Sequence, residues 1–137
     1  ALSREEMGHF KMVHDLILKR GNTLGRDRKD EYVIELLKFF PKGGSRTTQL
    51  VHRLLYAGLI EARSCERFRL LSEELEDRKL AEFYHKLMIS EAGHYTMFLK
   101  FARKYGELEE VNQKWNSLLE YEAKIMKDLG TKESIHG

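Results

Sequence analysis

The sequence predicts an all-α fold, a bundle of long helices with short connections. Three observations support this prediction. The chain has 137 residues but only one Pro, so almost nothing in it forces a helix to break. Apolar residues recur at intervals of three and four along most of the chain. A β-branched alternation typical of strands does not last even five residues anywhere in the sequence.

Length and composition narrow the class of protein further. A chain of 137 residues predicts one domain, and 42% hydrophobic with 34% charged residues predicts a folded core. The single Cys excludes a disulfide framework and is typical of a reducing compartment, so we expect a cytoplasmic protein. No apolar run approaches the roughly 20 residues that span a bilayer, so we expect no membrane.

The first two helices are expected in the N-terminal third. An apolar repeat over residues 10–17 predicts a helix that ends at Gly21-Asn22. A second apolar stripe predicts a helix from about Asp27 to Phe40, and residues 41–44 (Pro-Lys-Gly-Gly) end it.

Three longer helices follow. One is predicted from Thr47 or Thr48 to about Leu71, and one from Glu76-Asp77 to Tyr105-Gly106, the two packed antiparallel. The last is predicted from Leu108 to Leu129, ended by Gly130 and followed by a frayed tail.

A repeated motif carries the candidate chemistry. Glu6 and His9 form a Glu-x-x-His motif followed by an aromatic residue, and Glu91 and His94 form a second copy. Residues three apart on a helix share a face, so a carboxylate oxygen and an imidazole nitrogen can reach one metal ion. One copy alone is better explained as an ordinary Glu and a core His. Two copies on apolar faces favour a metal site, because an unpaired buried carboxylate is costly.

Glu61 is the candidate for a third carboxylate ligand. Its helix face holds apolar or small residues, whereas Glu66 lies among Arg63 and Arg69 and is expected to form an ion pair there. An antiparallel turn near residues 72–76 brings Glu61 level with Glu91.

These residues match the ligand pattern of a carboxylate-bridged di-metal site in a four-helix bundle. That pattern needs one more Glu, which by the same spacing falls about 30 residues before Glu6. We therefore expect residues 1–137 to form one ferritin-like helical domain that lacks its N-terminal helix. The alternative is that Ser3 and Glu6 form a capping box, which starts the helix there and weakens the site.

Three segments resemble the bacterial tRNA-(2-methylthio-N6-isopentenyladenosine) hydroxylase family. Residues 60–68 (Ile-Glu-Ala-Arg-Ser-Cys-Glu-Arg-Phe) are the most specific part, within a similar stretch over 50–68. Residues 82–84 with 90–95, and residues 4–10, resemble the family's two Glu-x-x-His segments.

The resemblance implies a non-haem di-iron monooxygenase that hydroxylates the isopentenyl group of the modified adenosine at tRNA position 37. Carried onto this sequence, it implies Glu6, His9, Glu61, Glu91 and His94 as ligands of two iron ions. O2 would be the co-substrate. The partners would be the tRNA anticodon region and an electron donor, a reductase or a ferredoxin-like protein.

Residues 1–53 carry 11 Lys/Arg against 7 Asp/Glu, which suits an anionic partner. Lys42, Arg46 and Arg53 are the candidate RNA-binding residues, although a solvated helix face explains the same charges. Two other functions stay open, namely a ferritin-like iron-binding or ferroxidase protein without a nucleic-acid substrate, and a non-catalytic helical module.

Overall fold

The computed structural model describes the backbone of residues 4–23 and 26–136. It describes the side chains of residues 4–5, 7–9, 11–15 and 31–130. All regular structure in these ranges is helical, which confirms the all-α prediction. The helices are α1 (Arg4–Thr23), α2 (Arg26–Leu37), α3 (Arg46–Glu74), α4 (Arg78–Tyr105) and α5 (Leu108–His136).

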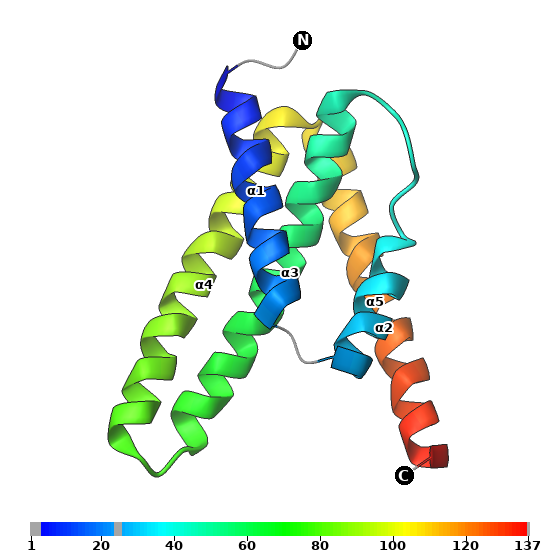
Figure 1. Cartoon of the computed structure of the whole chain (residues 1–137). Coiled ribbons are helices and arrows are strands. Elements are labelled where there is room, and N and C mark those ends of the chain that lie inside the picture. The colour runs from blue at the N-terminus through cyan, green and yellow to red at the C-terminus, as the bar shows by residue number, and fades with distance from the viewer. Residues whose placement is uncertain (1–3, 24–25, 137) are drawn as a thin grey trace.

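The two central helices, α3 and α4, form an antiparallel hairpin along their whole length (Figure 1). A short turn joins them. The backbone N–H of Leu75 bonds to Leu71 O at the end of α3, and the Asp77 carboxylate accepts hydrogen bonds from the N–H groups of Lys79 and Leu80. These caps satisfy backbone groups that the helix ends leave open. The predicted antiparallel pair is thus confirmed.

The other helices pack around this hairpin. Figure 1 shows α1 running along α3 near the N-terminal end of the chain, and α5 running beside α2 on the other side of α3. The chain turns sharply from α4 into α5 at Gly106. A Cβ atom there would lie 2.5 Å from Cγ2 of Val111, so this close approach requires glycine.

The core lies at the centre of the bundle, where all five helices contribute to it. Its largest fully buried apolar side chains are Val13, Leu36, Leu50, Leu54, Leu55, Leu59, Phe98 and Leu118. They fall on the apolar stripes that the helical spacing predicted. The stripe of α3 continues from Leu54 through Gly58 to Glu61, and this continuation directs a carboxylate into the bundle.

Two predicted helix ends are wrong. The helix expected to reach Phe40 ends at Leu37, as α2. Gly130 does not end α5, which continues through residues 131–136. A glycine inside a helix costs only about 1 kcal/mol relative to Ala. A glycine that ends a helix commonly adopts a left-handed conformation with a positive φ angle. Among the described glycines, Gly43 and Gly44 have positive φ angles and Gly130 does not.

Across the part of the chain that the structure describes, every helix is too short or too polar to cross a lipid bilayer.

Candidate metal centre

Two carboxylates from the central hairpin meet inside the bundle. Glu61 lies midway along α3 and is 1% exposed, and Glu91 lies midway along α4 and is 6% exposed. The turn at residues 75–77 brings Glu61 and Glu91 to the same level in the bundle, because the stretch of helix between each residue and the turn has a similar length. Both residues occupy positions that would otherwise belong to the apolar core.

His94 completes the cluster from the next turn of α4. Its Nδ1 atom lies 3.7 Å from Oε2 of Glu91 and 3.9 Å from Oε2 of Glu61. One ligand atom from each of Glu61, Glu91 and His94 can be chosen so that all three lie within 4.8 Å of one another. The Phe98 ring closes one side, with its centroid 6.4 Å from that of His94.

The geometry of this cluster suits a metal ion. Donor atoms that each lie about 2.0–2.2 Å from one metal ion are about 3–4 Å from one another. The distances from Nδ1 of His94 to the two carboxylate oxygens fall in this range. The Nδ1 atom of His94 is buried and has no hydrogen-bond partner among the described residues. Two buried carboxylates side by side are also unfavourable without a nearby positive charge. Carboxylate and imidazole ligands together are typical of first-row metals such as iron, manganese and zinc.

Glu66, the competing carboxylate, lies on the wet face of α3. Its side chain is 54% exposed, and Oε1 forms an ion pair with Nη1 of Arg63 at 2.9 Å. The predicted contrast in environment between Glu61 and Glu66 is therefore confirmed, although the role of Glu61 as a ligand stays a prediction.

The first Glu-x-x-His motif lies elsewhere along the bundle. The side chain of Glu6 is outside the described residues. The His9 ring stacks on Phe101 with centroids 3.8 Å apart, and its Nδ1 is 2.9 Å from the Tyr105 hydroxyl. Because Phe101 follows His94 by seven residues, His9 lies about 10 Å further along α4. The structure does not bring His9 to the other three residues, and its role as a ligand stays a prediction.

The predicted RNA-binding residues flank the connection between α2 and α3. Lys42 and Arg53 line a pocket there, and Arg46 is exposed at the first residue of α3. Five of the Lys/Arg residues counted over residues 1–53 lie in residues 16–30, whose side chains are outside the described part of the chain.

A polar network that the sequence did not predict joins α2, α3 and α5. The buried Glu122 of α5 accepts hydrogen bonds from Nε of Arg63 at 2.8 and 3.0 Å and from the Tyr32 hydroxyl at 2.5 Å. A second guanidinium nitrogen of Arg63 also pairs with it. Burial and the Glu122 carboxylate raise the pKa of Tyr32, so its phenol stays protonated. The partners are 59 and 90 residues apart, and no local sequence signal joins them.

The fold and the cluster define a class, an all-α ferritin-like bundle with a candidate carboxylate–histidine metal site.

Comparison with known sequences identifies the family. The sequence model described as tRNA-(MS[2]IO[6]A)-hydroxylase (MiaE) matches residues 1–137, so the chain belongs to this family. It is similar to the tRNA 2-(methylsulfanyl)-N(6)-isopentenyladenosine(37) hydroxylase of Pseudomonas putida, with 38% identity over 110 residues, which cover 80% of this chain and 52% of the relative.

It is also similar to the protein of the same name from Salmonella typhimurium, with 32% identity over 125 residues, which cover 91% of this chain and 45% of that relative. The chain thus spans about half the length of these curated relatives. No solved structure gives a significant match.

Proposed function

We propose that this chain carries the metal-binding part of an O2-dependent di-iron hydroxylase. Its substrate is the isopentenyl side chain of 2-methylthio-N6-isopentenyladenosine at position 37 of tRNA. The observation that carries this proposal is the buried cluster of Glu61, Glu91 and His94 in a chain of the MiaE family.

In this proposal Glu61, Glu91 and His94 hold one iron ion, and Glu6 and His9 contribute to the di-iron site. His9 joins the set only if α1 slides along α4 by about two turns, because its present partners are Phe101 and Tyr105.

Bound iron would supply the oxidising power that an unactivated C–H bond demands and that acid–base side chains lack. Hydroxylation of C–H by O2 consumes two electrons and two protons and releases one water, so an electron donor such as a reductase or a ferredoxin-like protein is part of the proposal. The chain itself holds the Glu61 and Glu91 carboxylates apart from solvent, whereas the His94 side chain is 38% exposed. Cys65 and Met88 help to fix the two ligand-bearing helices, since Sγ of Cys65 lies 3.5 Å from the Met88 carbonyl oxygen.

The test is an analysis of tRNA nucleosides by mass spectrometry in cells that lack the gene. Restoring the wild-type gene, or a Glu66→Gln variant, should restore the hydroxylated nucleoside. The near-isosteric Glu61→Gln variant should leave the isopentenyl nucleoside unhydroxylated at an equal protein level. Unchanged hydroxylated adenosine in the deletion strain would refute the proposed activity.

A further inference from the structure

A pocket of about 540 Å³ lies beside the connection between α2 and α3, away from the candidate metal centre. Its volume falls in the range of about 300–1,000 Å³ that is usual for small-ligand sites. Its described lining comes from the end of α2, the connection and the first turns of α3: Val33, Leu37, Phe40, Pro41, Lys42, Gly43, Gln49, His52, Arg53 and Tyr56.

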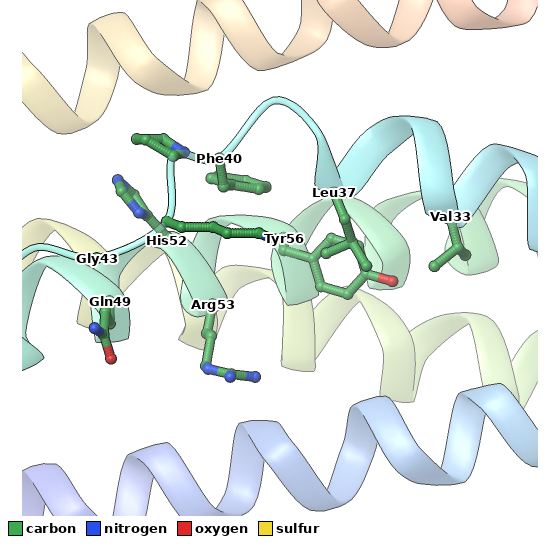
Figure 2. Close-up of a pocket in the computed structure, with 10 residues that line it drawn as sticks. Val33, Leu37, Phe40, Gly43, Gln49, His52, Arg53 and Tyr56 are labelled. Atoms are coloured by element: carbon green, nitrogen blue, oxygen red, sulfur yellow. The ribbon is translucent and has the colours of Figure 1, made fainter.

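Three aromatic rings form one wall of this pocket. Figure 2 shows the side chains of Phe40, His52 and Tyr56 gathered next to the connecting chain. The Phe40 centroid is 5.3 Å from that of His52 and 6.5 Å from that of Tyr56, and the latter pair is edge-to-face. Burial and the nearby Lys114 ammonium lower the pKa of His52, so its ring is neutral at pH 7. His52 and Tyr56 are only 7% and 6% exposed, so they hold the half-buried Phe40 ring in place. The open part of the Phe40 ring offers a face on which a planar base can stack.

The charge of the pocket is positive. Lys42 and Arg53 line it, and among its described lining residues none is acidic. In Figure 2 the Arg53 side chain extends from α3 on the side away from the Phe40 and His52 rings. The connection also passes through Gly43 and Gly44, at φ angles of +87° and +89°. Because glycine has no side chain, the backbone is uncovered where Gly43 borders the pocket. A cationic, glycine-edged rim next to an aromatic ring is complementary to a phosphate joined to a base.

We propose that this pocket binds one nucleotide of a single-stranded RNA segment, with its base against the half-buried Phe40 ring, which His52 and Tyr56 support from behind, and its phosphate at Lys42 and Arg53. Single-stranded loops are the RNA elements whose bases are free to stack on protein rings. The identification of that segment as part of the tRNA anticodon loop rests on the proposed function. Arg53 precedes Glu61 by eight residues, about 12 Å along α3, so this nucleotide differs from the one at the candidate metal centre.

The test measures the affinity of the purified protein for a fluorescein-labelled anticodon stem–loop RNA by anisotropy, over a range of salt concentrations. Phe40→Leu keeps an apolar side chain but removes the ring, and should weaken binding by about 5- to 100-fold. Lys42→Gln combined with Arg53→Gln should lower the slope of log affinity against log salt by about 1.4. Lys86→Gln, a matched change at an exposed lysine of α4, should bind like wild type. Circular dichroism melting shows whether each variant is folded.

A fully paired RNA duplex should compete at least fivefold less well than the stem–loop, because its bases are not free to stack. Wild-type affinity in folded Phe40→Leu and Lys42→Gln/Arg53→Gln proteins would overturn the proposal. So would an equal loss in Lys86→Gln, or hydrogen-exchange data that show the pocket covered by another segment of the protein.

The binding assay and the nucleoside analysis fail independently. RNA affinity that depends on the pocket, in a protein whose gene does not affect tRNA hydroxylation, would refute the proposed function and support the pocket. If the protein hydroxylates tRNA but the pocket variants bind RNA with wild-type affinity, the proposed nucleotide pocket alone would be refuted.

Discussion

Replacing Glu122 by Gln should destabilise the protein through the network that joins α2, α3 and α5. Glu122 is 3% exposed, and its carboxylate accepts hydrogen bonds from Arg63 and Tyr32. Glutamine keeps the shape but removes the charge and turns an NH2 group toward donors. Losing one partner of a buried pair costs about 3–5 kcal/mol. We expect a smaller loss, about 2–3 kcal/mol, because the Arg63 side chain is 39% exposed and also pairs with Glu66.

The assay is urea unfolding followed by far-UV circular dichroism at pH 7. The loss corresponds to a drop in Tm of about 6–10 °C for a domain of this size. Glu66→Gln is the matched control, since it removes the exposed carboxylate of the same guanidinium and should change stability by less than about 0.5 kcal/mol. If Glu122→Gln costs no more than Glu66→Gln, the network does not hold the three helices together and the reasoning is refuted.

Three further predictions concern stability. Burial and Lys114 lower the pKa of His52 in the folded protein. As the pH falls below about 6.5, His52 therefore binds a proton in the unfolded chain before it does so in the folded protein. Stability should therefore decrease from pH 7 to pH 5, and His52→Gln should make that decrease smaller in unfolding experiments at both pH values. Gly106→Ala should lose about 1–3 kcal/mol by urea unfolding, because its Cβ would meet Cγ2 of Val111 at 2.5 Å. Asp77→Ala should lose about 1 kcal/mol by the same measurement, because it removes the cap of α4.

The helices and their faces could be predicted from the sequence, because both depend on local spacing. The starts of α3 and α4, the end of α4 at Gly106 and the buried position of Glu61 all follow from periodicity and capping residues. Gly130 shows the limit of such signals, since a single glycine did not outweigh the helical preference of its neighbours.

The axial positions of helices that are distant in sequence could not be predicted in this way. A short turn fixes the level of Glu61 against Glu91, but nothing local fixes where α1 lies along α4. Periodicity correctly places His9 on an inward face, yet the structure sets it against Phe101 and Tyr105 instead of His94. The partners of Glu122 escaped prediction for the same reason, because spacing tells which face a residue occupies and not which distant residue it meets.

The central claim is that Glu61, Glu91 and His94 bind iron, and anaerobic titration with ferrous iron tests it most directly. Calorimetry would measure the affinity, and melting would measure the stability of the loaded protein. At an iron concentration about 100 times the Kd, binding should add about 2.7 kcal/mol and raise Tm by roughly 10 °C. Glu66→Gln should behave like wild type, and Glu61→Gln should show neither binding heat nor a shift in Tm. Ferrous iron binding by Glu61→Gln with wild-type affinity would contradict the account.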